Sequence, residues 1–278
     1  MTKPSLTAPD IAEIIEIRQD TSDTKTFTLQ YIDSEKQKAF NFVPGKFMMV
    51  SVFGVGEMPI SISSSPLKTD SLQLTIVDVG NLTHAMHRLK EGDKVGLRGP
   101  FGNGFPIQKF RKKNLVFISG GCGMAPLKPV VDAVIGKKEE FGKLTLLYGC
   151  KAPENMLFNK ELEDWDKAPE LTTLKTVDNP TPEWEGESGV VTKLFPKAGL
   201  NPENAIALIV GPPVMIHFAI IELKKMGFKE AQIYASLERL MYCGMGKCAH
   251  CNCGGKYACI DGPVFNGEEL AKMPLGEK

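Results

Sequence analysis

Five of the seven cysteines in this chain fall within 17 residues near the C-terminus. Four of them follow the spacing C-x4-C-x2-C-x7-C: Cys243, Cys248, Cys251 and Cys259. In a cytosolic protein such clustering indicates metal binding rather than a disulfide framework. The first two intervals match those of plant-type [2Fe–2S] ligands, and the glycines between them permit a loop that wraps a cluster. The segment therefore predicts a [2Fe–2S] cluster held by these four thiolates.

A structural zinc site is the alternative for the same segment, because four thiolates also suit tetrahedral Zn²⁺. Zinc sites usually show two C-x2-C pairs, and only one such pair occurs here. Cys253 leaves the ligand set open, since it could replace Cys251 or Cys259, although the C-x2-C spacing favours Cys251. His250 lies between two of the ligands, and we expect it to be an exposed loop residue.

The composition is that of an ordinary globular protein, with 278 residues of which 42% are hydrophobic and 24% charged. Lys and Arg total 33, as do Asp and Glu, so no basic excess favours a nucleic-acid partner. The first ten residues lack the layout of a secretory signal, and apolar runs such as 205–210 are too short to span a bilayer. We therefore expect a soluble, cytoplasmic protein without membrane insertion.

Residues 1–108 read as short strands separated by Gly, Pro, Ser and Asp. Residues 26–29 alternate polar and apolar, and 46–53 and 72–79 are apolar runs. Several short strands at regular spacing predict an antiparallel β-barrel. One short helix is expected at 83–89.

Residues 109–236 alternate strands with helices, which predicts a parallel sheet of βαβ units. Strands are expected at 114–118, 144–148, 171–177, 206–210 and 232–235, with helices up to 135 and at 154–164. Residues 237–278, the cysteine-rich tail, fit neither pattern. The expected fold class is thus a β-barrel followed by an α/β domain and a small C-terminal cluster loop.

Two glycine-bearing loops follow strands of the second segment, at Ser119–Pro126 and Gly211–Met215. Glycines let the backbone approach a pyrophosphate, and a helix N-terminus offers free N–H donors. The first loop is not a G-x-G-x-x-G fingerprint, so on its own a tight strand–helix turn explains it equally well. Two such loops on one parallel sheet would frame a ligand at the carboxyl ends of its strands.

Taken in order, the barrel, the nucleotide segment and the cysteine-rich tail resemble the ferredoxin-reductase superfamily over residues 8–270. The chain most resembles the cytosolic electron-transfer subunits of sulfhydrogenases (gamma), anaerobic sulfite reductase (B) and dihydroorotate dehydrogenase B. Residues 237–265 are similar to that branch's cluster-binding segment, except that Cys253 stands where Cys is unusual. The form of residues 57–62 is closer to the hydrogenase and sulfite reductase subunits.

The resemblance implies an FAD site on the barrel. The family's Arg-Pro-(Tyr/Ile)-Ser motif corresponds to Pro59, Ile60 and Ser61, with Met58 in place of the Arg. Without that Arg, how the flavin pyrophosphate is held stays open. The further implied flavin contacts are Ile76, Val77, Leu82 and Thr83.

The resemblance also implies that both glycine-bearing loops bind NAD(P)H. The residues concerned are Gly120, Gly121, Gly123, Met124, Ala125, Pro126, Gly211, Pro212 and Met215. Whether the nucleotide is NADH or NADPH stays open, since Lys151 alone is weak support for a 2′-phosphate contact. The choice between FAD and FMN rests on the resemblance only.

The implied function is electron transfer from NAD(P)H through the flavin and the cluster to a partner redox subunit, without a catalytic acid or base. The cysteine-rich tail stands where many ferredoxin reductases place an aromatic residue over the flavin, which implies that electrons leave toward a partner. A non-catalytic, zinc-stabilised adaptor is the main alternative, and the absent Arg at position 58 favours it. A free-standing flavin reductase is a third, which the tail argues against. The partner's identity and the direction of flow stay open.

Overall fold

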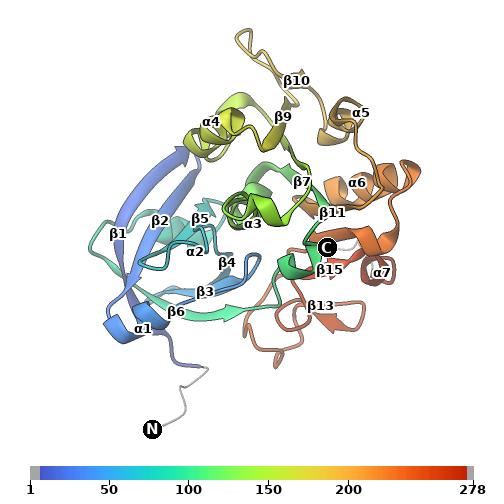
Figure 1. The fold of residues 1–278 in the computed structure, drawn as a ribbon. Coiled ribbons are helices and arrows are strands. Elements are labelled where there is room, and N and C mark those ends of the chain that lie inside the picture. The colour runs from blue at the N-terminus through green and yellow to red at the C-terminus, as the bar shows by residue number, and fades with distance from the viewer. Residues whose placement is uncertain (1–6, 274–278) are drawn as a thin grey trace.

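The computed structural model describes residues 7–273, which form two large β-sheets and a small hairpin (Figure 1). Residues 1–6 and 274–278, the outer ends of the first and third expected segments, lie outside the described residues. The first sheet is antiparallel and the second is mainly parallel with helices around it. The expected fold class is confirmed.

The first sheet has six strands in the order β4-β3-β6-β1-β2-β5, and every neighbouring pair is antiparallel. Its strands are β1 (Asp10–Thr21), β2 (Thr24–Tyr31), β3 (Phe47–Val52), β4 (Gly56–Ser61), β5 (Leu72–Val77) and β6 (Lys94–Phe101). A β-bridge between Ile62 and Leu74 joins the two edges, so the sheet curls into the expected barrel. The barrel core includes Phe27, Met48 and Leu97.

Two helices lie in the connections of the barrel. Helix α1 (Ser34–Ala39) begins after Asp33, whose carboxylate accepts hydrogen bonds from two backbone N–H groups of the first turn. Helix α2 (Asn81–His87) corresponds to the helix expected at 83–89. It packs against β3 and β4, which places it next to the predicted flavin segment.

The second sheet has seven strands in the order β10-β9-β8-β7-β11-β12-β15, all parallel except the last pair. They are β7 (Asn114–Gly120), β8 (Leu144–Cys150), β9 (Leu171–Val177), β10 (Glu187–Ser188), β11 (Ala205–Val210), β12 (Ile233–Ser236) and β15 (Val264–Asn266). All of β11 is buried, because a central parallel strand is covered on both faces.

Helices cover the two faces of this sheet. On one face α3 (Met124–Ile135) packs through Leu127 and Val131, and on the other α6 (Pro213–Lys225) packs through Ile216 and Leu223. The remaining helices are α4 (Asn159–Lys167), α5 (Phe195–Ala198) and α7 (Gly267–Leu270). Short 3-10 turns span Ile107–Phe110, Gly121–Gly123, Lys138–Glu140, Pro153–Asn155, Val191–Leu194 and Glu230–Gln232.

Helix α4 begins at Asn159, later than the expected start at 154. Residues Pro153–Asn155 form a separate 3-10 turn, and Phe158 adopts a left-handed conformation with φ of 60°. An L-residue in that conformation interrupts a right-handed helix, so the regular turns start only after it.

The cysteine-rich tail is built into the second sheet, whereas the sequence pattern had placed it outside both sheets. Strand β15 pairs with β12, and the hairpin of β13 (Asn252–Cys253) and β14 (Lys256–Tyr257) precedes it. The Asn103 amide donates hydrogen bonds to the carbonyls of Asp261 and Val264, at 2.8 and 2.7 Å. The tail is therefore held by the second sheet and by the connection between the two sheets.

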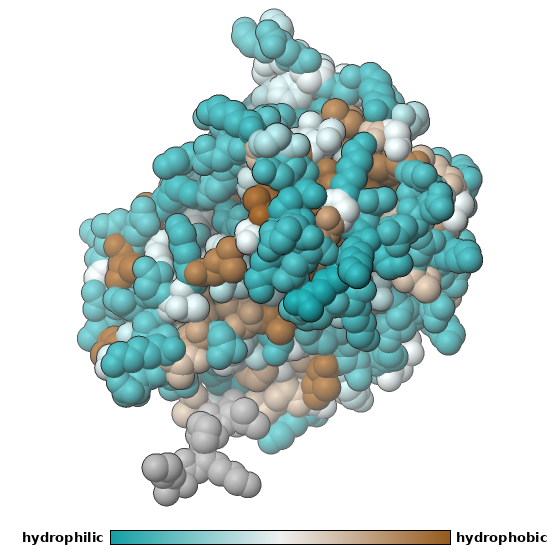
Figure 2. Space-filling model, in the orientation of Figure 1, coloured by the Kyte–Doolittle hydropathy of each residue, from teal (hydrophilic) through white to brown (hydrophobic). Residues whose placement is uncertain are grey.

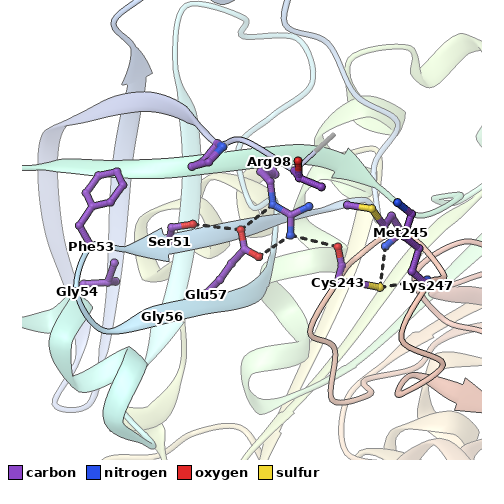
Figure 3. A pocket seen from close by; sticks show the side chains of 12 residues that line it. Ser51, Phe53, Gly54, Gly56, Glu57, Arg98, Cys243, Met245 and Lys247 are labelled. Carbon is purple, nitrogen blue, oxygen red and sulfur yellow. Dashed lines mark hydrogen bonds and ion pairs between the residues drawn. The ribbon is translucent and has the colours of Figure 1, made fainter. Parts of the chain in front are cut away.

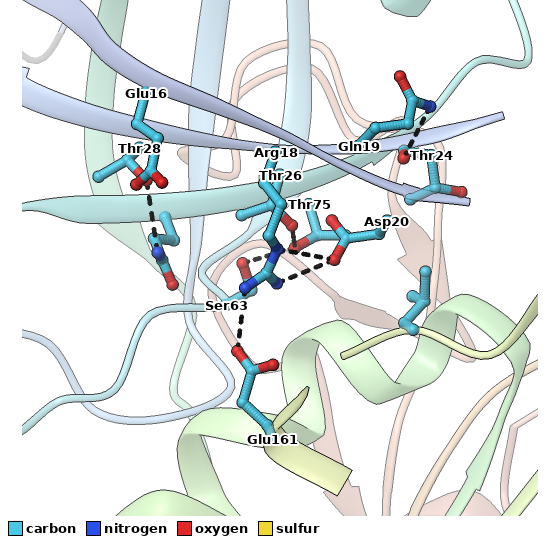
Figure 4. Close-up of polar contacts among 12 residues, drawn as sticks. Glu16, Arg18, Gln19, Asp20, Thr24, Thr26, Thr28, Ser63, Thr75 and Glu161 are labelled. Atoms are coloured by element: carbon cyan, nitrogen blue, oxygen red, sulfur yellow. Dashed lines mark hydrogen bonds and ion pairs between the residues drawn. The ribbon is translucent and has the colours of Figure 1, made fainter. Parts of the chain in front are cut away.

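Ionic contacts join the barrel to the second sheet (Figure 4). Arg18 of β1 lies 3.2 Å from Glu161 of α4 and 2.9 Å from Asp20 of its own strand. The Arg18 guanidinium also lies over the ring of Phe158, 5.6 Å from its centroid. The Asp20 side chain is only 4% exposed, so Arg18 compensates a buried carboxylate while it bridges the two sheets.

The face of the molecule drawn in Figure 2 is mostly hydrophilic, with apolar residues in small scattered groups. Small groups of this kind are normal on a protein surface. Among residues 7–273, no helix is both long enough and apolar enough to cross a bilayer.

Candidate functional site

A cavity of about 630 Å³ opens at the carboxyl ends of the parallel strands. Its lining includes Gly120, Gly121, Cys150, Lys151, Asp178, Pro212, Val214, Met215, Phe218 and Glu222. This edge of an open α/β sheet is where such folds bind ligands. The structure therefore brings the two predicted nucleotide loops together around one cavity.

The glycines of the two loops allow close packing, against the flexible Met215 side chain at Gly120 and Gly211 and against backbone at Gly123. A Cβ atom on Gly120 would lie 2.3 Å from the sulfur of Met215, and one on Gly123 would lie 2.4 Å from the carbonyl oxygen of Val210. Gly211 is equally tight against Met215. Gly121 differs, because it has a φ of +53° and open space around it. Its bare backbone thus faces the cavity, as a pyrophosphate cradle requires.

Three predicted nucleotide residues belong to helix α3 rather than to the cavity wall. The side chains of Met124, Ala125 and Pro126 are buried, and the first two pack in the core beneath the helix. What they present toward the loop is the first turn of α3. Any contact they make with a nucleotide would come from the backbone.

The cavity also contains charged residues that the sequence did not single out. Lys151 follows β8, as expected, but Asp178 after β9 and Glu222 on α6 line the same cavity. A position directly after a buried strand was the only available signal for Asp178. Two carboxylates beside one Lys make the cavity less favourable for a 2′-phosphate than Lys151 alone suggests.

Cys122 lies in the first loop, in the turn Gly121–Gly123. Desolvation raises the pKa of its thiol to about 11, although part of the side chain is exposed. The carboxylates of Glu238, after β12, and Asp23, in the β1–β2 turn, raise it further. The Cys122 thiol thus feels carboxylates from the barrel and from the start of the tail.

The predicted flavin segment forms the end of β4. Pro59, Ile60 and Ser61 are half-buried, and Met58 is 6% exposed and packs in the barrel core. Met58 therefore cannot replace the phosphate contact of the family's Arg. Because side chains alternate along a strand, Pro59 and Ser61 lie on the face opposite Met58.

The other predicted flavin residues surround this strand. Val77 and Leu82 are half-buried, and Leu82 packs against Gly56 at the start of β4. Ile76 instead points into the barrel core. The Thr83 hydroxyl accepts hydrogen bonds from two backbone N–H groups, of Val79 and Gly80, at 2.9 Å each. The half-buried apolar groups and the Ser61 hydroxyl suit a flat aromatic ring with a polar edge.

The cysteine loop surrounds its first thiol with backbone donors. The N–H groups of Met245, Lys247 and Cys248 donate to the sulfur of Cys243, at 3.3 to 3.4 Å. Burial alone would raise the pKa of this thiol, but these hydrogen bonds outweigh burial and lower it. Donors aimed at a sulfur stabilise a thiolate, which is the form that binds metal.

The remaining predicted ligands lie on both sides of this loop. The sulfurs of Cys251 and Cys259 are 3.3 Å apart and buried, and the N–H of Gly246 donates to Cys259 at 3.1 Å. Cys248 is exposed. The four residues thus form a loop with a buried side and a solvent-facing side.

The donor set fits an iron–sulfur cluster, because backbone N–H groups are aimed at the sulfurs of Cys243 and Cys259. A [2Fe–2S] cluster spreads its four ligands over two irons and accepts N–H bonds at its sulfurs. Cys253 is 1% exposed in β13, where burial raises its pKa despite the nearby Arg239.

Two family models match parts of the chain. Residues 117–220 match the oxidoreductase NAD-binding domain, and residues 238–271 match the iron–sulfur cluster binding domain of dihydroorotate dehydrogenase B. The first range contains both nucleotide loops, and the second contains all four predicted cluster ligands.

Curated relatives match nearly the whole chain. Sulfhydrogenase 2 subunit gamma of Pyrococcus furiosus is 43% identical, over 91% of this chain and 93% of the relative. A probable dihydroorotate dehydrogenase B (NAD(+)) electron transfer subunit of Methanocella arvoryzae is 34% identical, over 97% of this chain and 95% of the relative.

Solved structures share the fold. A chain of NADH-dependent reduced ferredoxin–NADP oxidoreductase has a TM-score of 0.75 at 26% identity, and the match covers 97% of this chain and 91% of that one. The ferredoxin NADP+ reductase of Neisseria gonorrhoeae has a TM-score of 0.69 at 20% identity, over 81% of this chain and 96% of that one. The second likeness concerns the fold alone.

Proposed function

This chain belongs to the family that includes sulfhydrogenase gamma subunits and the electron-transfer subunits of dihydroorotate dehydrogenase B. From this family and the site geometry, we propose that it transfers electrons through three bound cofactors. It binds FAD on the barrel, NAD(P)H at the second sheet and a [2Fe–2S] cluster in the tail. Electrons pass between NAD(P)H and a partner redox subunit of a heteromeric complex. The chain is an oxidoreductase of the ferredoxin-reductase fold.

One observation carries this proposal. The loop that aims backbone donors at Cys243 leads into β15, which belongs to the same sheet as β7, β8, β9 and β11. Those four strands end at the nucleotide cavity. A redox site that receives electrons from a nicotinamide must be held at a fixed place relative to it. A shared sheet supplies that rigidity.

The side chains have distinct proposed roles. Cys243, Cys248, Cys251 and Cys259 hold the cluster, and Gly121 leaves room for the nucleotide pyrophosphate. Pro59, Ile60 and Ser61 orient the flavin, and Val77 and Leu82 exclude water from its ring. When bound, the flavin supplies the exchange between two-electron and one-electron chemistry, and the cluster supplies a one-electron carrier.

The proposed division of the chain has three parts, of which the third contributes β15 to the second sheet. Residues 1–108 form the FAD-binding barrel, 109–236 the NAD(P)-binding domain, and 237–278 the cluster-binding tail. The first boundary falls between β6 and β7, and the second falls directly after β12. We further propose that the protein works in the cytoplasm.

The zinc-stabilised adaptor is less well supported. The matches to an oxidoreductase NAD-binding domain and to an iron–sulfur domain both favour the redox function. Its main support is the absent Arg at position 58, where Met58 is buried in the barrel core.

An anaerobic absorption spectrum of the purified protein, before and after addition of NADH or NADPH, tests the proposal. We expect flavin and iron–sulfur bands that bleach with at least one nucleotide, which would also identify the donor. A colourless protein that retains stoichiometric zinc would overturn the proposal in favour of the adaptor.

A further inference from the structure

An ion pair lies between the barrel and the cysteine loop, in a pocket lined by both (Figure 3). Arg98 of β6 donates from Nε to one Glu57 oxygen at 2.8 Å and from Nη2 to the other at 2.5 Å. Ser51 of β3 donates to the same carboxylate at 3.1 Å. Three adjacent strands of the barrel therefore contribute one side chain each.

Arg98 also reaches the cysteine loop. Its Nη2 atom donates to the carbonyl oxygen of Cys243 at 3.1 Å, and its guanidinium lies 5.6 Å from the centroid of Phe101. A Cβ atom on Gly244 would lie 2.9 Å from Met49 and 3.2 Å from Phe101, so the loop rests directly on the barrel at this point. The Arg98 side chain is 7% exposed and that of Glu57 is 23% exposed, so the contact with the loop is part-buried.

The same ion pair is continuous with the proposed flavin strand. Glu57, Pro59 and Ser61 alternate along β4 and so share one face of it. Met49 of β3 is paired with Arg98 on one side and with Pro59 on the other. The contact at Cys243 is thus two strands away from the residues that we assign to the flavin.

We propose that Arg98 is a positioning residue that fixes Cys243 relative to the flavin strand and whose positive charge sets the reduction potential of the cluster. The inference rests on the proposed function, because it needs a cluster at Cys243. A cluster gains one negative charge on reduction, and a nearby cation stabilises the reduced form. The effect is large where few water molecules screen the charge.

Glu57 carries the charge opposite to that of Arg98, so substitutions at the two residues should shift the cluster potential in opposite directions. Arg98→Gln removes the cation and leaves the carboxylate, so the cluster potential should fall. Glu57→Gln removes the anion and leaves the cation, so the potential should rise. We expect each change to alter the ratio of reduced to oxidised cluster about tenfold at a fixed potential, which corresponds to about 59 mV for one electron.

The measurement is a redox titration of the full chain with bound cofactors, followed by electron paramagnetic resonance of the reduced cluster. Lys94→Gln is the matched control, since it removes one exposed positive charge from the same strand, about 13 Å away at the usual rise per residue. Its cluster potential should stay at the wild-type value.

Opposite shifts in the two pair variants, with the control unchanged, would support the inference. If Arg98→Gln does not retain iron, a rise in Glu57→Gln still supports it. An unchanged potential in Glu57→Gln with full iron content would overturn it. A wild-type protein without iron would instead contradict the proposed function itself, so the two failures are distinguishable.

Discussion

At the scale of single residues, the glycines of the nucleotide loops differ in what they contribute. Gly120, Gly123 and Gly211 allow the loops to pack, because a Cβ atom on any of them would overlap a neighbour. Gly121 has no neighbour within 4 Å of such an atom. Its role is therefore to present backbone to the cavity, and substitution there tests binding rather than folding.

We expect Gly121→Val to raise the KM for NAD(P)H at least about tenfold, because the branched side chain fills the space of the pyrophosphate. The measurement is steady-state reduction of an artificial acceptor by NADH and NADPH. Gly199→Val is the matched control, since Gly199 has a similar φ of +57° and equally open surroundings at the end of α5. Both variants carry the same backbone strain, so equal KM values in the two would contradict the assignment of the loop.

At the scale of elements, the cysteine loop depends on four side chains but contains a fifth thiol. Cys248 is exposed and lies within the loop that wraps the cluster, whereas Cys253 is buried in β13. Burial does not distinguish Cys253 from the proposed ligands Cys251 and Cys259, which are buried in the same core. The contacts differ, because the Cys251 sulfur lies 3.3 Å from that of Cys259, whereas Arg239 hydrogen-bonds to the Cys253 thiol. The sequence left the two roles of Cys253 open.

Cys248→Ser should lose the cluster and electron transfer to the partner while NAD(P)H still reduces the flavin. Cys253→Ser should retain about two irons per chain, because the C-x2-C spacing favours Cys251 over Cys253 as the ligand. Iron analysis and the absorption spectrum after nucleotide addition measure both effects. Loss of iron in Cys253→Ser alone would show that the ligand set includes Cys253.

The expected helices and strands that the structure contains are those with a local pattern of apolar residues. The strand at 171–177 and the helix up to 135 have the bounds that their apolar patterns predict. Strand β1 was missed because its residues 13–20 are largely charged or polar, although the strand pairs along its whole length. Strand β15 was missed because only its pairing with β12 identifies it.

The residues of the candidate site likewise fall into those that the sequence predicted and those that it did not. Spacing alone predicted the four cysteines, and glycine content predicted the loops that meet at the cavity. Asp178, Glu222 and the pair of Arg98 with Glu57 were not predicted. Their proximity arises from strand orders such as β4-β3-β6, which bring together residues distant in the sequence.

At the scale of the whole molecule, the two sheets must keep a fixed relation for electrons to pass between their cofactors. Arg18 is a bridge of this kind, since it reaches from β1 to Glu161 of α4 and lies over Phe158. Asp20, its neighbour on β1, is 4% exposed. Loss of Arg18 and loss of Glu161 should therefore lower the free energy of unfolding by different amounts.

Arg18→Met should lower the free energy of unfolding by about 2 to 3 kcal/mol, because it leaves the Asp20 carboxylate buried without a cation. The expected loss is below that of a fully buried pair, since the Arg18 side chain is 37% exposed. Glu161→Gln should cost no more than about 1 kcal/mol, because Asp20 still compensates Arg18. Thermal and urea unfolding of the protein with bound cofactors measure both.

Arg111→Met is the control for this asymmetry, because Arg111 forms a 2.8 Å ion pair with Glu140 inside the second domain and is 53% exposed. An exposed pair of this kind contributes less than about 1 kcal/mol. If Arg18→Met were no more destabilising than Arg111→Met, the contact at Arg18 would be an incidental surface pair. A clearly larger destabilisation by Arg18→Met, together with flavin release at a lower temperature, would support the bridge. It would show that the buried Asp20 carboxylate makes Arg18 necessary for stability.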